Sequence, residues 1–478
     1  MTLSICTHIN DFFTNIASEL FSLLPLPTNL FGTDSETFRD FYANMGITPN
    51  AFKLDRVSED VILKILSDLD PYKGAGLDGL APKFLKDGAP QLTPIITHIV
   101  NLSLISESVP DDLKSAKIIP LHKKKSRLDV GNYRPISILS CVSKVLERCV
   151  YIQIESYLRE NQILYDYQSG FRPGYSTETC LIHLTDYIRS ELSCGNYVGM
   201  LLLDVQKAFD SVNHDILCSK LEFMGINPNW FRSYLSNRQQ LVSIDGISSD
   251  FQKISCGVPQ GSILGPLLYL CYSNDMVSSV RNKLLLYADD SVILVSNKDP
   301  QVVARELSKD LNSCNQWLID NRLSLHVGKT ECILFGSHAN LDNAKDFKIS
   351  YNGQVICPKD SISYLGATID KTLSGDKFVD DLTKKVAGRL KFLYRHSSYL
   401  TQKLRKKLCN ALLQCHIDYC SSAWYSGIGI RAKQKLQVTQ NKMVRFILDL
   451  SPRSHIDQST LNSIKLLNSQ DRVYPASA

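Results

Sequence analysis

The chain has 478 residues, of which 44 % are apolar and 21 % charged, and a formal net charge of +5. This composition is typical of globular proteins and excludes a predominantly disordered or fibrous chain. The length is enough for two or three lobes, and no apolar run approaches the ~20 residues that a membrane-spanning helix needs. Fourteen cysteines are scattered without a Cys-x-x-Cys pair, which favours a reduced intracellular protein over a secreted disulfide scaffold.

Charge is distributed unevenly along the chain. Residues 371–478 contain 19 Lys and Arg against 7 Asp and Glu, whereas the preceding part has a negative balance. A basic C-terminal part beside an acidic centre suggests that one part holds a polyanion and another works on it. A solvated basic helix surface is the alternative explanation.

The first 110 residues divide into an irregular and a helical segment. Residues 1–55 contain several Pro and Gly breakers and are predicted to be irregular, as a leader or linker. Helical periodicity begins after Ser58 and predicts an N-terminal helical extension over 56–110, which carries a Gly-rich turn at 73–79.

The central region mixes strands with helices. Strands are predicted at 117–121, 198–203, 241–244, 284–287, 291–295, 330–335 and 363–369. Helices are predicted at 140–160, 177–193, 214–224, 266–276 and 302–322, followed by an apolar helical stripe that starts at Phe378. This order predicts an α+β fold with an all-helical, basic C-terminal region.

Carboxylates stand at two strand ends in this layout. Asp204 closes the strand 198–203, and Asp289 and Asp290 form the tip of a hairpin with apolar flanks. If these strands are neighbours, three acids converge at one sheet edge, where their repulsion requires a cation. Oxygen ligands of this kind suit Mg²⁺. The alternative is a structural turn, because Asp favours turns.

Further segments occur in a fixed order along the chain. They are Lys-Gly-Ala-Gly-Leu-Asp-Gly at 73–79, Asn-Tyr-Arg-Pro-Ile-Ser at 132–137, Gln-Ser-Gly-Phe-Arg at 168–172, Leu-Asp followed by Ala-Phe-Asp within 203–210, Gly-Val-Pro-Gln-Gly-Ser at 257–262, Tyr-Ala-Asp-Asp at 287–290, Asn-Arg-Leu followed by Lys-Thr within 321–330, and Tyr-Leu-Gly at 364–366. With these motifs, the chain resembles the reverse transcriptases of non-LTR (LINE-type) retrotransposons, the jockey-like group in particular, over residues 56–449. The ordered set is specific, whereas any one motif is not.

The resemblance implies a right-hand polymerase with an antiparallel-sheet palm, helical fingers and a helical thumb. Fingers and palm would form a reverse transcriptase domain over 111–370, and the thumb would lie in 371–478. The implied activity is RNA-directed DNA polymerisation, which adds dNTPs to a DNA 3′-end on an RNA template. The implied cofactor is a pair of Mg²⁺ ions, with Mn²⁺ as a substitute. The implied location is intracellular, in the nucleus or a cytoplasmic ribonucleoprotein, without a membrane partner.

The resemblance also assigns roles near the reacting atoms. Asp204 and Asp289 would be the main metal ligands, helped by the carbonyl of Val205, and Asp290 would be a neighbouring acid. The dNTP would be bound by Lys123, Arg134, Phe209, Gln260 and Lys329. Of these, Phe209 would lie under the sugar and exclude a ribose 2′-hydroxyl, and Lys329 would lie near the leaving pyrophosphate. Phe209 as a core residue and Lys329 as an ordinary exposed lysine are the alternatives, and Lys124 and Lys125 are as available as Lys123.

The template–primer duplex would be held by backbone and shape rather than by base reading. The residues implied for this contact are Gly261, Tyr287, Lys384, Lys385, Lys403, Arg405, Lys406 and Lys407. We expect this sequence to lack the endonuclease module of a full-length element and to have a truncated C-terminal region. Two alternatives stay open: an intron-encoded maturase, and a nucleic-acid-binding remnant that does not polymerise.

Overall fold

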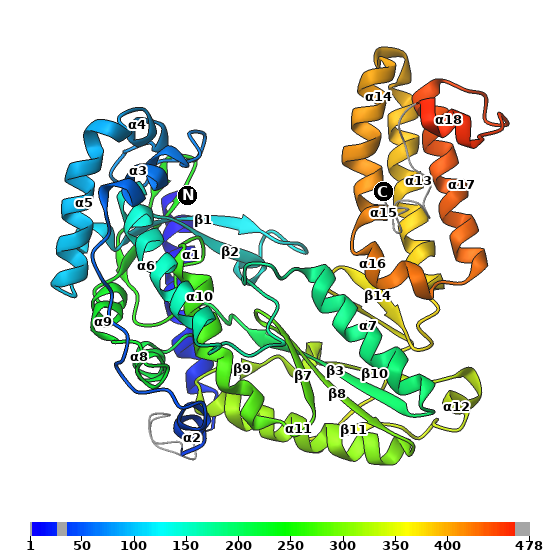
Figure 1. Ribbon diagram of the computed structural model, residues 1–478, viewed down its shortest axis with the longest axis horizontal. Helices are drawn as coiled ribbons and strands as arrows, with labels where there is room; N and C mark the ends of the chain where they lie inside the picture. The colour runs from blue at the N-terminus through cyan, green and yellow to red at the C-terminus, as the bar shows by residue number, and fades with distance from the viewer. Residues whose placement is uncertain (1, 26–35, 464–478) are drawn as a thin grey trace.

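Figure 1 shows the computed structural model, which describes residues 2–25 and 36–463. An N-terminal lobe of helices and strands continues into a central sheet, and a C-terminal helical bundle stands across from the N-terminal lobe. The mixture of helices and antiparallel strands agrees with the predicted α+β class. In the described part of the chain, no helix is long and apolar enough to cross a membrane.

The central sheet has the strand order β10 (Glu331–Phe335), β3 (Tyr197–Gln206), β8 (Asp290–Asn297) and β7 (Lys283–Tyr287), all antiparallel, and β9 (Ser324–Leu325) pairs with the end of β3. Strand β3 is apolar almost throughout because both of its faces are covered. Leu201 and Leu203 belong to a core that includes α11 (Pro300–Asp320), whereas Val198 and Met200 belong to a second core that includes α7 (Thr177–Ser193).

A second sheet lies in the N-terminal lobe. Its strand order is β2 (Tyr133–Ile138), β1 (Ser115–His122), β4 (Gln239–Ile244) and β5 (Ile247–Ser248), with β6 (Gln252–Lys253) also paired to β4. The helices of this lobe and its junction with the central sheet are α3 (Glu59–Ser67), α4 (Pro82–Asp87), α5 (Ala89–Ile105), α6 (Cys141–Glu160), α8 (His214–Phe223), α9 (Asn229–Leu235) and α10 (Leu264–Ser273).

Helix boundaries follow local capping chemistry. The Ser140 side chain accepts hydrogen bonds from the backbone N–H groups of Val142 and Ser143 and so starts α6. A reciprocal capping box of Ser176 and Thr179 starts α7. Helix α10 begins at Leu264, before Pro266, because a proline is tolerated in the first helical turn.

The prediction that residues 1–55 are irregular was wrong for two segments. Helix α1 (Thr2–Ser22) packs along β4 and β5, and α2 (Glu36–Asn44) packs on α8. Cys6, Ile9 and Phe13 of α1 form a small core with β1 and β4, and this tertiary burial stabilises a helix whose sequence neighbours are helix breakers.

The C-terminal bundle consists of α13 (Asp376–Arg395), α14 (Gln402–Cys409), α15 (Cys415–Asp418), α16 (Ser421–Trp424), α17 (Ile430–Leu448) and α18 (Gln458–Ser463). It follows a hairpin of β13 (Ser361–Tyr364) and β14 (Ala367–Asp370), where a single strand-like segment was predicted. The connection from the central sheet holds α12 (His338–Asp342), β11 (Ile349–Tyr351) and β12 (Gln354–Ile356).

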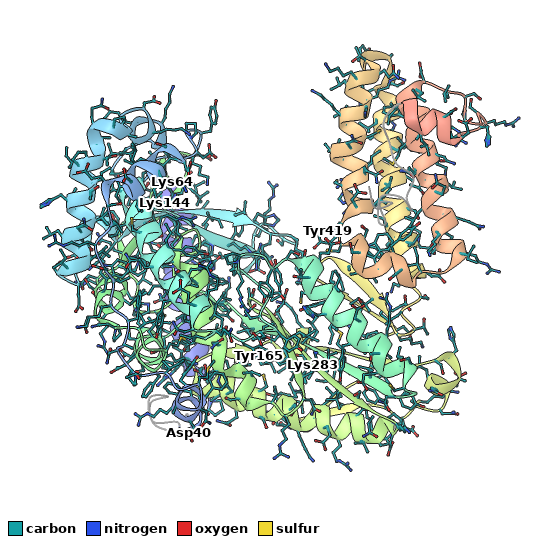
Figure 2. The ribbon with its side chains drawn as sticks, in the orientation of Figure 1. Asp40, Lys64, Lys144, Tyr165, Lys283 and Tyr419 are labelled. Carbon is teal, nitrogen blue, oxygen red and sulfur yellow. The ribbon has the colours of Figure 1, made fainter. Side chains whose placement is uncertain are left out.

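The base of the bundle is fixed to the central part. Figure 2 shows Tyr419 at this base, near the start of α7, where its hydroxyl donates to the carbonyl of Leu365 at 2.7 Å. The backbone N–H of Ser422 also donates to Glu178 of α7 at 3.2 Å. The hairpin turn and α7 therefore set where the bundle stands above the sheet.

Candidate active site

The predicted acidic hairpin tip lies at one end of the central sheet. β7 and β8 are joined by a two-residue turn, in which Ala288 has a left-handed φ of 56°. β8 also pairs with β3, and Asp204 is the register partner of Asp290. Directly opposed residues on antiparallel strands lie on the same face of the sheet. The expectation that these strands are neighbours, and that Asp204, Asp289 and Asp290 share one sheet edge, is confirmed.

The three acids repel one another in this position. Burial, followed by the charges of Asp289 and Asp204, raises the pKa of Asp290 from its ordinary value of 3.8 to about 6. The Asp289 side chain is exposed in the cleft. Neighbouring atoms nevertheless desolvate its carboxylate, and this desolvation, followed by the charge of Asp204, raises the pKa of Asp289. An added positive charge between these groups would be stabilising.

The donor set fits a divalent cation only when substrate oxygens complete it. Within residues 2–25 and 36–463, no three His, Cys, Asp or Glu side chains come close enough to make a full metal site. Lys329 Nζ lies 2.9 Å from Asp204 Oδ2 and partly neutralises it. Mg²⁺ characteristically takes one or two carboxylates plus substrate phosphates, and Asp204 and Asp289 match that requirement.

The acidic turn rests on the segment 167–170, a support that the sequence motif did not reveal. Ser169 N–H donates to the Leu286 carbonyl at 2.8 Å, and Gln168 Oε1 accepts from the backbone N–H of Ala288 at 3.1 Å. A Cβ on Gly170 would lie 2.4 Å from the Ala288 nitrogen. Only glycine lets this segment lie so close to the turn.

The loop 257–262 is hydrogen-bonded both to strand β2 and to the segment that follows β3 of the central sheet. Gln260 Nε2 donates to Asp210 Oδ1 at 2.8 Å, and the Gln260 carbonyl accepts from Ser137 N–H at 2.7 Å. Gly261 has φ 118°, and a Cβ there would lie 2.6 Å from the Ser137 carbonyl oxygen. Because β2 also carries Arg134, this loop fixes the distance between Arg134 and the central sheet.

Phe209 is held between aromatic rings. Its ring stacks on Tyr269 with centroids 4.8 Å apart, and the ring of Phe171 meets it edge-on at 6.0 Å. One part of Phe209 packs against the core, and another part lines the cleft. Phe209 is therefore a packing residue that also lines the cleft, and its role against a ribose 2′-hydroxyl stays a prediction.

Cations and acids line one cleft of about 850 Å³. The predicted residues that it brings together are Lys123, Arg134, Asp204, Val205, Phe209, Gln260, Gly261, Asp289, Asp290 and Lys329. Lys207, which the sequence reasoning missed, lies in the same lining, whereas Lys124 and Lys125 do not. Desolvation, followed by the charges of Arg134, Lys207 and Lys329, lowers the pKa of Lys123.

The basic residues of the bundle divide into two groups. Lys384, Lys385, Lys403 and Lys407 are exposed, and Lys406 is half-buried. The prediction that Arg405 contacts the template–primer duplex is wrong. Its guanidinium donates hydrogen bonds to the carbonyls of Leu400, Ser397 and Phe446 inside the bundle. Arg405 is therefore a structural residue and is not available for phosphate contact. Tyr287 is half-buried at the end of β7 and is not part of the cleft lining.

A cleft in which carboxylates and several cations face one another is typical of phosphoryl-transfer sites. Residues 121–369 match the family described as "Reverse transcriptase (RNA-dependent DNA polymerase)". The chain belongs to this reverse transcriptase family, as the motifs predicted.

Among curated proteins, the chain is 30 % identical over 416 residues to the "Probable RNA-directed DNA polymerase from transposon BS" of Drosophila melanogaster. The matched region covers 82 % of this chain and 44 % of that protein. It is 27 % identical over 413 residues to the "RNA-directed DNA polymerase from mobile element jockey" of the same species, with coverage of 82 % and 44 %. The chain thus spans less than half the length of these relatives.

Proposed function

We propose that this chain is the RNA-directed DNA polymerase of a non-LTR retrotransposon and adds dNTPs to a DNA 3′-end on an RNA template. The observation that carries the proposal is the cleft that gathers Asp204, Asp289 and Asp290 opposite Lys123 and Arg134. The names of the relatives, which include the jockey element, agree with this activity.

The proposed architecture is a right hand. The central sheet with α7 and α11 is the palm, the N-terminal sheet with its helices forms the fingers, and the bundle of α13, α14 and α17 is the thumb. In residue numbers, 56–110 is an N-terminal extension, 111–370 the reverse transcriptase domain and 371–478 the thumb region. The exposed lysines of α13 and α14 suit the phosphates of a template–primer duplex. The proposed site of action is intracellular.

The roles at the centre follow from charge and position. Asp204 and Asp289, with the Val205 carbonyl, would hold Mg²⁺, and bound Mg²⁺ lowers the pKa of an attacking hydroxyl and stabilises a leaving pyrophosphate. Arg134 offers a planar fork and Lys123 a point charge to the triphosphate. Lys329 forms an ion pair with Asp204, so it is placed to exchange that partner for the pyrophosphate when substrate binds.

The test is primer extension by the purified 478-residue chain on a poly(rA) template with an oligo(dT) primer and Mg²⁺. We expect Asp289→Asn to reduce extension by at least about 10³-fold, because a ligand of the developing charge is lost while the shape is kept. Binding of the template–primer should persist. The matched control is Asp245→Asn, which neutralises an exposed aspartate in the turn between β4 and β5.

Two results would count against the proposal. Full extension by Asp289→Asn would remove the acidic turn from the chemistry. No metal-dependent extension by the wild-type chain, with template–primer binding retained, would support the alternative of a nucleic-acid-binding remnant.

A further inference from the structure

Helix α1 forms one wall of the cleft, although it comes from the first residues of the chain. Phe12, Ile16 and Leu20 of this helix belong to the cleft lining. The adjoining face of α1 is buried against the N-terminal sheet through Cys6 and Phe13, and Phe12 packs partly against the same core. The helix is therefore anchored on one face and presents the other to the site.

Lys207 contacts α1 within the cleft. Its Nζ is 5.4 Å from the centre of the Phe12 ring, within the distance of a cation–π contact. Its backbone has a left-handed φ of 46°, and its carbonyl accepts hydrogen bonds from Asp210 at 2.9 Å and Ser211 at 3.0 Å. Both the main chain and the side chain of Lys207 are thus held in place.

The cleft gathers four cations: Lys123, Arg134, Lys207 and Lys329. Lys329 is paired with Asp204 at 2.9 Å, and Asp210 lies near Lys207. No described carboxylate forms an ion pair with Lys123, Arg134 or Lys207, so these three cations can neutralise a multiply charged anion that enters the cleft. Lys207 follows Asp204 by only three residues, whereas the exposed lysines suited to duplex phosphates are on the bundle. A triphosphate beside the acids therefore accounts for Lys207 better than a template phosphate does.

We propose that Lys207 binds the triphosphate of the incoming dNTP and that Phe12 is a positioning residue that holds the Lys207 ammonium toward it. Helix α1, which lies outside the matched segment 121–369, thereby becomes part of the nucleotide site. This inference rests on the proposed polymerase function.

The first experiment compares Lys207→Met and Lys207→Arg in steady-state extension by the full chain. Loss of a charge-assisted phosphate contact should raise the dNTP KM about tenfold in Lys207→Met. Inhibition by inorganic tripolyphosphate should weaken by a similar factor. Lys207→Arg should retain most of the affinity. Lys124→Met, which removes a lysine outside the cleft, is the control and should leave the dNTP KM unchanged.

The second experiment tests the role of Phe12. Phe12→Leu should raise the dNTP KM about threefold, the value of an exposed cation–π contact, with little change in kcat, and Phe12→Tyr should restore it. Cys6→Ala, at a fully buried residue of α1 that is outside the cleft lining, controls for loss of helix packing. In the Lys207→Met background, Phe12→Leu should add nothing.

The outcomes separate the inference from the function on which it rests. Extension by the wild-type chain with an unchanged dNTP KM in Lys207→Met overturns the inference alone. A weaker template–primer Kd with an unchanged dNTP KM would instead assign Lys207 to the nucleic acid and also overturn it. An equal effect of Phe12→Leu in both Lys207 backgrounds would refute the positioning role. Absence of extension by the wild-type chain would overturn the polymerase proposal itself.

Discussion

Gly170→Ala should impair catalysis by displacing the acidic turn. The added Cβ would lie 2.4 Å from the Ala288 nitrogen and 3.0 Å from the Tyr287 carbonyl carbon. Ordinary van der Waals contact begins near 3.4 Å, so the turn must move by about 1 Å, and a misplacement of about 1 Å can reduce a rate about 10²-fold. Both contacted atoms are main-chain atoms, which cannot rotate away as a side chain could. Asp289, the next residue, must move with them.

The assay is single-turnover primer extension at saturating dNTP, together with thermal unfolding to verify the fold. The matched control is Gly74→Ala, because a Cβ at Gly74 meets nothing within 4 Å. We expect the control to extend primers like the wild-type chain. A folded Gly170→Ala protein with a rate within about twofold of wild type would refute the reasoning, because the 100-fold estimate assumes that the turn itself is shifted.

Three further predictions concern other parts of the site. Phe209→Ala should admit ribonucleotides, and unchanged dNTP/rNTP discrimination would reduce Phe209 to a packing residue. Because the pKa of Asp290 is raised from 3.8 to about 6, the folded chain binds its proton more tightly than the unfolded chain and should lose stability as pH rises from about 4 to 6. Asp290→Asn should flatten that part of the Tm profile in metal-free buffer, and an unaltered slope would contradict the assignment. Arg405→Gln should cost about 2 kcal/mol of unfolding free energy through unsatisfied buried carbonyls and leave template–primer affinity intact. Lys407→Gln should leave the unfolding free energy unchanged, weaken template–primer binding and reduce the slope of log K against log salt concentration by about 1. Weaker template–primer binding with unchanged stability in Arg405→Gln would instead assign Arg405 to the duplex interface.

The sequence was sufficient where local pattern decides structure. The apolar runs on both sides of Asp289 and Asp290 predicted the hairpin, because two strand-like runs separated by a very short polar turn are typical of antiparallel neighbours. Helical periodicity after Ser58 predicted the start of α3, which begins at Glu59. The order of the motifs also predicted the family, which no single motif could do.

Tertiary packing decided what the pattern could not. Helix α1 was read as irregular because Pro and Gly follow it, yet its apolar face is buried on a sheet whose strands come more than a hundred residues later. Arg405 was read as a phosphate ligand because it stands in a basic run, yet the helix rotation points it at carbonyls inside the bundle. Lys207 and Phe12 are nearly two hundred residues apart and meet only in the folded chain.

The acids at residues 204, 289 and 290 illustrate both sides. The sequence by itself placed them at strand ends, because strand and turn patterns are local. Only the pairing of β3 with β8 made Asp204 and Asp290 register partners, and only the approach of residues 168–170 fixed the turn. Such contacts depend on which distant segments pack together, and a periodic pattern in one segment does not encode its partner.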